Sequence, residues 1–329
     1  MLDLSIVIIN WNTCNLLKDC INSISEETEG VSYEIIVVDN GSSDHSVEMV
    51  KENYSLVKII ANEANAGFTK ANNQGFRIST GRFVLMLNSD TVIKDNALKK
   101  MLIFADENVS AGIVGCKLRY PNGDFQNSCF RFPDLSSIFL SGTFLPKLFP
   151  KNRILNKERY GMCEWSSVHS VDCVMGSCLL IRREVLAAVD YLDENYFMYC
   201  EETDLCMKVK RIGFKVLYYP DTYIIHIYGG SQKNWAGLAW SYNAINRGVL
   251  LFLTKWHPVF VAPIANVMLL LFSVPRLFLW GGLDIIDSIK EKREFTSQRL
   301  LKFYTYSFHA KALFNITKFK EPWGGRKLK

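Results

Sequence analysis

The stretch Arg82-Phe83-Val84-Leu85-Met86-Leu87-Asn88-Ser89-Asp90 decides the fold prediction for this chain. Its apolar run is short, follows Gly81 and stops abruptly at polar residues, which is typical of a buried central strand. In open α/β sheets, ligands bind in the crevice outside the carboxyl ends of the strands. Asp90 is therefore a candidate ligand-binding residue, although an Asp in this position also commonly ends a strand or caps a helix.

Three strand and helix pairs precede this stretch. Apolar runs at 4–9, 33–38 and 56–60 predict strands, and helical periods begin near Thr13, which is placed to cap its helix, near Ser46 and after Asn65. This alternation indicates an α/β fold with a mostly parallel sheet flanked by helices. No GxGxxG motif follows the first strand and no GxxxxGK[ST] motif occurs, so the usual dinucleotide and P-loop sites are excluded.

Polar side chains gather at the carboxyl ends of these predicted strands. The residues concerned are Asn10, Asn12, Asp39, Asn40, Asn62, Asn88 and Asp90. Turn residues with a purely structural role would be spread over both ends of a sheet. Their concentration at one edge favours a ligand crevice.

The chain then returns through a helix after Asp95 to a strand at 113–118 and a turn at Pro121-Asn122-Gly123. Residues 125–165 are aromatic, rich in Pro and poorly periodic, which predicts loops that shape an acceptor site. The segment 171–183 predicts a loop running into an apolar strand, and a short helix at 183–189 follows.

A second cluster of chemically active residues opens a helix that ends at Gly213. Glu201, Glu202 and Asp204 all lie in its first turn. Acidic residues at this place ordinarily complement the helix dipole. Adjacent like charges also raise the pKa of at least one carboxyl group, toward the range that a general base needs.

His226 lies at the exit of a predicted strand that begins at Lys215. A single His among apolar residues is most often a core side chain whose hydrogen bonds are made within the protein. Here Gly229-Gly230 follows closely, as in loops that approach phosphates, which favours a ligand role.

The last ninety residues, roughly, differ in composition. Residues 256–274 carry no formal charge if His257 is neutral, and the tail after Lys318 is basic. This length is just sufficient to cross a bilayer, but internal Pro258, Pro263 and Asn266 weaken that interpretation. Three alternatives stay open: an interfacial or re-entrant membrane helix, a full span, and a buried core or dimer helix.

The whole chain has 329 residues, is 49% hydrophobic and has a formal net charge of +5. It is therefore large enough for a substantial core, and disorder is excluded. Lys and Arg are spread out before the tail, so no nucleic-acid partner is expected. The nine Cys residues form no CxxC pair, and the N-terminus resembles no signal peptide, so we expect reduced thiols and a cytoplasmic location.

Seven separated stretches, in order, resemble the family 2 glycosyltransferases with the GT-A fold. They are SIVIINWN at the N-terminus, VVDNGSSD at 37–44, NAGFTKANNQG at 65–75, LMLNSDT at 85–91, VDCVMGSCLLIRR at 171–183, YFMYCEETDLCMKVKRIG at 196–213 and HIYGGS at 226–231. The chain looks most like the rhamnosyltransferase-like branch that builds O-antigen and capsule. The resemblance implies a GT-A domain at 1–240, with a nucleotide-sugar half at 1–120 and an acceptor half at 121–240, followed by a helical membrane-associating region at 241–329.

The resemblance also implies roles for individual residues. Asp39 matches the position that binds the nucleotide base, and Asp90 the last Asp of the DxD motif that holds Mg²⁺ or Mn²⁺. Glu202 matches the catalytic base, with Glu201 as the substitute candidate, and His226 matches a His that completes the metal site in some members. The residues expected to bind the nucleotide-sugar are Asn10, Asn12, Asp39, Asn40, Asn65, Gly67, Asn72, Asn88, Ser89 and Asp90.

The chain departs from the family pattern at two positions: Asn88 replaces the first Asp of DxD, and Glu202 replaces the Asp of the ED motif. One or two carboxylates plus substrate phosphates often suffice to hold such a metal, so Asp90 can still serve. The expected reaction is single displacement with inversion, in which the metal neutralises the departing diphosphate and the base deprotonates the acceptor hydroxyl.

The leading hypothesis is a transferase at the cytoplasmic face of the bacterial inner membrane that moves L-rhamnose from dTDP-rhamnose to a lipid-linked glycan. A UDP-hexose or UDP-HexNAc donor is the alternative within the family. An inactive GT-A-like membrane scaffold and a soluble binding module are alternatives outside catalysis. Whether the protein acts alone or as a homodimer is left open.

Overall fold

The apolar run at 83–87 forms strand β4 (Phe83–Asn88) in the interior of the sheet. This computed structural model describes residues 2–143, 145–227 and 235–272. The neighbours of β4 are β1 (Leu4–Asn10), which is parallel, and β11 (Cys178–Arg182), which is antiparallel. Every residue of β1 is buried, as expected for a strand that is covered on both faces.

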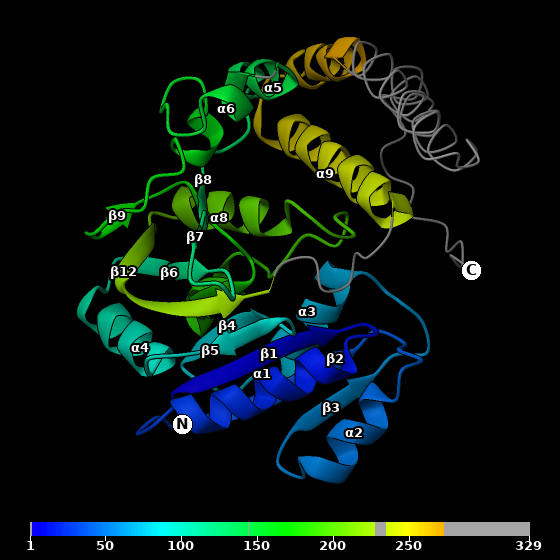
Figure 1. The fold of residues 1–329 in the computed structure, drawn as a ribbon, viewed down its shortest axis with the longest axis vertical. Coiled ribbons are helices and arrows are strands. Elements are labelled where there is room, and N and C mark those ends of the chain that lie inside the picture. The colour runs from blue at the N-terminus through cyan, green and yellow to red at the C-terminus, as the bar shows by residue number, and fades with distance from the viewer. Residues whose placement is uncertain (1, 144, 228–234, 273–329) are drawn as a thin grey trace. The chain divides into compact units, whose positions relative to one another are not determined.

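Within the described residues, the main sheet has the strand order β3-β2-β1-β4-β11-β6-β12-β5 (Figure 1). The bounds of the other strands in this order are β2 Tyr33–Asp39, β3 Lys58–Ala61, β5 Thr91–Ile93, β6 Ala111–Arg119 and β12 Lys215–His226, and two short strands, β7 (Phe125–Gln126) and β9 (His169–Ser170), pair with β6 and β12. Strands β3, β2, β1 and β4 are parallel, and so are β6 and β12. The predicted α/β fold is confirmed, with a sheet that is mixed because β11 runs against both of its neighbours.

Helices cover both faces of this sheet. Their bounds are α1 Cys14–Glu27, α2 Ser46–Asn53, α3 Phe68–Ile78, α4 Ala97–Glu107, α7 Arg183–Ala188 and α8 Glu201–Arg211. Leu4, Ile6 and Ile8 of β1 share one core with apolar residues of α1 and α4. Val7 points to the other face, where a Cβ at Gly75 of α3 would lie 2.4 Å from its Cγ1, so α3 packs there because residue 75 has no side chain.

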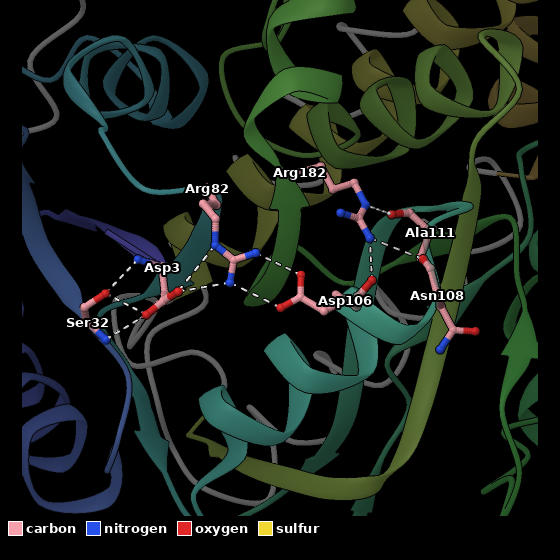
Figure 2. A network of polar contacts seen from close by, with 8 residues as sticks. Asp3, Ser32, Arg82, Asp106, Asn108, Ala111 and Arg182 are labelled. Carbon is pink, nitrogen blue, oxygen red and sulfur yellow. Dashed lines mark hydrogen bonds and ion pairs between the residues drawn. The ribbon is translucent and has the colours of Figure 1, made fainter. Parts of the chain in front are cut away.

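Ion pairs hold the amino end of β4, opposite the predicted ligand edge (Figure 2). The Arg82 guanidinium donates to Asp3 Oδ1 and to Asp106 Oδ1, each at 2.9 Å. Hydrogen bonds from Ser32 and Arg82 lower the pKa of Asp3 to about 2. Arg182, at the end of β11, donates through Nε to the Ala111 carbonyl at 2.8 Å. These contacts anchor adjacent strands away from the candidate site.

The Cα packing divides the chain into two compact units. The first combines Met1–Phe132 with Met162–Ser231, and the second combines Pro133–Gly161 with Gln232–Lys329. The functional domains predicted at 1–240 and 241–329 stay a prediction, because packing units need not coincide with functional ones.

The segment 125–165 is less irregular than predicted. It contains β7 (Phe125–Gln126), β8 (Cys129–Phe130), α5 (Leu135–Gly142), α6 (Leu145–Leu148) and the 3₁₀ turn η1 (Lys157–Arg159). Helix α5 begins with a capping box between Asp134 and Ser137. Asp134 is a common helix N-cap, but Ser137 stands where the capping-box pattern has Glu or Gln, so the start signal was weak and the prediction of loops was wrong there.

The second unit is helical where it is described. It contains α5, α6, α9 (Trp235–Trp256) and a helix over residues 261–272. No helix in the described parts of the chain combines the length and apolar character required to cross a bilayer. The end of the uncharged stretch, and the basic tail predicted to contact headgroups, lie outside the described residues.

Candidate functional site

A chain of hydrogen bonds joins the carboxyl ends of β2, β1 and β4. Asn10 Nδ2 donates to Asp39 Oδ1 at 2.8 Å, and Thr13 Oγ1 donates to Asn10 Oδ1 at 2.7 Å. The Thr13 hydroxyl also lies 2.9 Å from the hydroxyl of Ser89. All four side chains are buried. The structure thus brings together three of the predicted donor-binding residues, in a network that ends next to Asp90.

The loops after β1 and β2 are also fastened to each other. Asn12 Oδ1 accepts from the Ser43 N–H at 2.8 Å, and the Asn12 N–H donates to Ser42 Oγ at 2.9 Å. The Ser42 N–H in turn donates to Asp39 Oδ2 at 2.9 Å. Asn12 itself is exposed, so it both fixes this loop and faces solvent beside it.

A second group of predicted residues surrounds the loop before α3. Asn40 Nδ2 donates to the Gly67 carbonyl at 3.2 Å, and Asn65 Oδ1 accepts from the Gly67 N–H at 2.9 Å. Asn72 Nδ2 donates to the Phe68 carbonyl at 2.9 Å. Asn40 is buried and Asn65 is exposed, and both fix the loop, whereas the buried Asn72 bonds within the first turn of α3.

This loop docks on the segment that leads into α8. The Phe68 N–H donates to the Phe197 carbonyl at 2.8 Å. Gly67 has φ of 92° and ψ of 156°, and a Cβ there would lie 2.8 Å from a ring carbon of Phe197. Glycine is required at this position by both its backbone conformation and the close approach.

Asp90 and His226 meet at the edge of the sheet. Asp90 Oδ1 lies 3.3 Å from His226 Nε2, and the Ile227 N–H donates to the Asp90 carbonyl at 2.9 Å. The antiparallel pairing of β5 with β12 sets His226 opposite Thr91, which places its ring beside Asp90. The Asp90 and His226 side chains are 14% and 5% exposed.

The donor atoms at this edge fit a divalent cation. Adjacent ligands of an octahedral Mg²⁺, each about 2.1 Å from the ion, lie about 3 Å apart, close to the Asp90 to His226 separation of 3.3 Å. Asn88 Oδ1, two residues before Asp90 in the chain, is buried and has no hydrogen-bond partner among the described residues, so this oxygen is left for a polar ligand. No cluster of three or more His, Cys, Asp or Glu suited to a metal occurs in the described residues, so substrate phosphates and water would complete the shell.

The two adjacent carboxyl groups of α8 have unusual surroundings. Burial raises the pKa of both Glu201 and Glu202, and repulsion from the Glu202 charge raises that of Glu201 further. Backbone N–H groups at the start of the helix act in the opposite direction, through one contact at Glu201 and through three at Glu202, from Cys200, Glu202 and Thr203. The two environments therefore favour a proton on Glu201 and a charge on Glu202, which is the arrangement of an acid and base pair.

The start of α8 lies next to the sheet. A Cβ at Gly176 would lie 2.8 Å from Met86 Cε of β4 and 3.5 Å from Glu202 Cβ. Tyr199 and Cys200, directly before the helix, have φ of 71° and 67°, a left-handed conformation that non-glycine residues adopt at a cost. Such backbone strain often occurs where a functional side chain is held in position.

Two residues escaped the sequence prediction. Thr13 was expected only to cap α1, but its side chain makes no cap hydrogen bond and instead joins the strand ends. Gln126, in the stretch predicted as loops, places Oε1 2.9 Å from His226 Nδ1. In the sequence Gln126 stands between Phe125 and Asn127 in a segment without clear periodicity, so nothing there singles it out.

The comparisons with known proteins agree with this fold. The model of "Glycosyl transferase family 2" matches residues 5–189, more than half of the chain. The chain is 26% identical over 234 residues to N-acetylglucosaminyl-diphospho-decaprenol L-rhamnosyltransferase of Mycobacterium tuberculosis, covering 68% of this chain and 75% of that protein. It is 26% identical over 229 residues to rhamnosyltransferase WbbL of Escherichia coli K12, covering 67% and 82%.

Two solved structures show the same fold. One is the mannosyltransferase PcManGT of Pyrobaculum calidifontis in complex with GDP-Man and Mn²⁺, with a TM-score of 0.56, 12% identity and coverage of 97% of this chain and 90% of that one. The other is GalNAc-T7 with UDP, GalNAc and Mn²⁺, with a TM-score of 0.56, 18% identity and coverage of 78% and 51%. From the family match, the fold and these relatives, the chain belongs to glycosyl transferase family 2 and is a glycosyltransferase that resembles its rhamnosyltransferases.

Proposed function

We propose that this glycosyltransferase moves L-rhamnose from dTDP-rhamnose to a hydroxyl of a lipid-linked surface-polysaccharide intermediate, with inversion at the anomeric carbon. The observation that carries the proposal is the continuous polar edge from Asp39 through Asn10, Thr13 and Ser89 to the Asp90 and His226 pair. The names of the two rhamnosyltransferase relatives support the choice of sugar, and the name of the mycobacterial one supports the lipid-linked acceptor.

In this proposal Asp90 and His226 bind Mg²⁺ or Mn²⁺ together with the diphosphate of the donor, and Asn88 contributes its buried side-chain oxygen. The presence of Mn²⁺ in the two structural relatives supports a divalent metal. When bound, the metal would neutralise the charge that develops on the departing nucleoside diphosphate. The two carboxylate oxygens of Asp39 each accept one hydrogen bond from the protein. Each keeps a second lone pair that can accept a hydrogen bond from the nucleotide base of the donor.

The other donor contacts come from the two loops described above. Asn12 faces solvent beside the strand ends and is placed to touch the donor directly. Asn40, Asn65 and Gly67 act by fixing the loop proposed to border the donor, because their polar groups bond within it, and Asn72 supports the first turn of α3 that follows.

Glu202 is the base that takes the proton of the acceptor hydroxyl, and Glu201 is its protonated neighbour. Burial keeps the pKa of Glu202 above its usual range, which makes the carboxylate a better proton acceptor near neutral pH. Because the base acts when ionised, activity should be lost as the pH falls through this raised pKa.

The second unit supplies contact with the membrane surface at the cytoplasmic face. Phe260, Ile264, Val267 and Leu271 recur at helical spacing and are 59%, 44%, 43% and 62% exposed. The turn at 147–154 exposes Leu148, Phe149 and Ile154 together with Lys147, Lys151 and Arg153. Exposed apolar side chains between basic ones suit an interfacial contact with anionic lipid.

The test is donor binding and hydrolysis across dTDP-, UDP- and GDP-sugars with Mg²⁺ or Mn²⁺, in the parent and in Glu202→Gln. We expect one donor to bind, with turnover falling at least about 10²-fold in Glu202→Gln while binding is kept. Glu184→Gln is the matched control, because Glu184 is an exposed glutamate in the first turn of α7. Failure of the parent to bind any nucleotide-sugar would favour the inactive scaffold.

A further inference from the structure

We infer that Gln126 is a positioning residue that sets the imidazole of His226 for metal binding. The inference rests on the proposed metal role of His226. Neither the family resemblance nor the names of the relatives assign a function to Gln126. It concerns a contact made from a strand that the sequence did not predict.

The sheet places the two side chains in contact. Gln126 ends β7 and lies opposite Leu118 of β6, and Leu118 in turn lies opposite Ile224 of β12. Two residues further along β12, His226 turns its ring toward Gln126, so that Nδ1 lies 2.9 Å from Oε1. Gln126 and His226 are 2% and 4% exposed, so bulk water does not compete for this hydrogen bond.

The two ring nitrogens of His226 face different partners. Nδ1 faces the amide oxygen of Gln126, which accepts hydrogen bonds and has no proton to donate. Nδ1 of the neutral ring therefore carries the proton, and Nε2 keeps its lone pair. That lone pair is directed toward Asp90 Oδ1, 3.3 Å away, which is also an acceptor.

In that tautomer Nε2 and Asp90 Oδ1 both present lone pairs, which a cation between them would bind. Gln126 thus prepares the Asp90 and His226 pair to receive a metal ion. Without it, the proton of the neutral ring could move to Nε2, where it would donate to Asp90. The pair would then satisfy itself, and metal binding would have to break that hydrogen bond.

The effect of such a contact on metal affinity has a known size. A metal-binding His commonly donates its other ring N–H to an oxygen acceptor, and loss of that acceptor typically weakens metal affinity 10- to 100-fold. We expect the same range here. The effect should appear in metal affinity, and in activity chiefly through the metal concentration that is required.

The experiment measures Mn²⁺ affinity in the presence of dTDP by the electron paramagnetic resonance of free Mn²⁺. Gln126→Met keeps the length of the side chain but removes the acceptor, and it should weaken Mn²⁺ binding roughly 10- to 100-fold. Gln126→Glu keeps an acceptor at the same position and should stay within a few-fold of the parent. Asn127→Ala is the matched control, because Asn127 is a buried neighbouring amide that bonds to the Cys129 carbonyl.

A second readout does not involve the metal. In the metal-free parent, the ¹⁵N shifts of the neutral His226 ring should show a protonated Nδ1 and an unprotonated Nε2. Gln126→Met should move the proton to Nε2, whereas a merely structural role for Gln126 would leave the tautomer unchanged. Circular dichroism and thermal melting establish that each variant is folded.

The outcomes separate this inference from the proposed function. If Asp90→Asn and His226→Ala lose Mn²⁺ binding while folded Gln126→Met keeps it within twofold, the positioning role is overturned and the metal site stands. A parent ring protonated at Nε2, with loss of binding in Gln126→Glu, would mean that Gln126 donates to His226, which also overturns the inference. If neither Asp90→Asn nor His226→Ala changes Mn²⁺ affinity, the metal assignment falls and the inference falls with it.

Discussion

At the scale of single residues, the paired glutamates of α8 show how one helical turn gives two identical carboxyl groups different preferences for the charged form. Both carboxyl groups are buried, but backbone N–H groups of the first turn favour the charged form of Glu202, whereas the Glu202 charge disfavours the charged form of Glu201. The sequence already placed both residues in a first helical turn. Only the structure shows which of the two environments favours the charge.

Replacement of Glu201 by Gln should stabilise the protein. A carboxyl group whose pKa is raised by folding contributes its stability below the unfolded pKa of about 4.3, and that contribution is lost as the pH rises toward the folded value. Glu201→Gln removes this ionisation, so its gain in the free energy of unfolding should grow with pH above about 4.3 and reach roughly 1 kcal/mol or more at pH 8. Urea unfolding at pH 4.5 and pH 8 measures it.

Glu184→Gln again serves as the control, since an exposed glutamate should change the free energy of unfolding by less than about 0.5 kcal/mol at either pH. Equal stability of Glu201→Gln and the parent at pH 8 would contradict the raised pKa of Glu201.

Other residue assignments show where sequence reasoning stops. Asn10 and Asp39 were predicted to share an edge, because parallel strands end together, and Ser89 was expected to bind the donor from the family resemblance. The structure places all three in one hydrogen-bond network. Thr13 joins that network because α1 starts directly above the ends of β1 and β4. A linear sequence does not reveal such a link between two strand ends.

At the scale of elements, the loop before α3 and the segment before α8 depend on each other. The Phe68 N–H bonds to the Phe197 carbonyl, and Gly67 leaves room for the Phe197 ring. The loop carries residues that we propose to bind the donor, and the segment leads to Glu202. Their docking couples the donor loop to the proposed base.

Gly67→Ala should therefore destabilise the protein by more than backbone strain alone. Gly213→Ala is the matched control, because Gly213 has the same φ of +92° but has open space around its Cβ position. We expect about 1 to 3 kcal/mol of destabilisation from positive φ in both variants, and a further 1 to 3 kcal/mol, roughly, from the Phe197 contact in Gly67→Ala. Urea unfolding measures both variants, and donor affinity should fall only in Gly67→Ala.

If Gly67→Ala and Gly213→Ala lose the same stability and bind donor equally, the proposed coupling of loop and helix is wrong.

Element types were readable from the sequence, but strand direction was not. The segment 171–183 predicted a loop running into an apolar strand, yet nothing local indicated that this strand, β11, would enter the sheet antiparallel between β4 and β6. Strand direction depends on where the chain re-enters the sheet, which the long segment between β6 and β11 decides. The short β7 that carries Gln126 forms only because β6 offers it a partner.

At the scale of the whole molecule, the chain combines a sheet-based unit with a helical one. The first unit holds all the residues proposed to bind the donor, the metal and the acceptor proton. The second exposes an apolar helical face, which we propose contacts lipid. This division suits an enzyme that takes a soluble donor and a lipid-linked acceptor.

The double variant Phe260→Ser/Leu271→Ser should weaken binding to vesicles that contain anionic lipid. Each large apolar side chain that is buried on binding contributes about 1.5 to 3 kcal/mol, so the partition coefficient should fall at least about tenfold. Flotation of the full chain with anionic and with uncharged vesicles measures it. Ile103→Ser is the matched control, since Ile103 is 50% exposed on α4 of the first unit.

Unchanged flotation of the double variant would mean that another part of the chain, or a second copy of it, covers this helical face.

The sequence by itself determined the α/β class, most strands and helices of the first unit, and the edge at which its polar residues gather. These features follow from local periodicity and from the rule that parallel strands present their carboxyl ends together. The family resemblance already implied that Asp90 and His226 share a site, but their contact, and the contacts of His226 with Gln126 and of Gly67 with Phe197, come from the tertiary structure. Each of them joins segments far apart in the sequence, and such contacts depend on how strands pair across the sheet and loops dock, which local pattern does not encode.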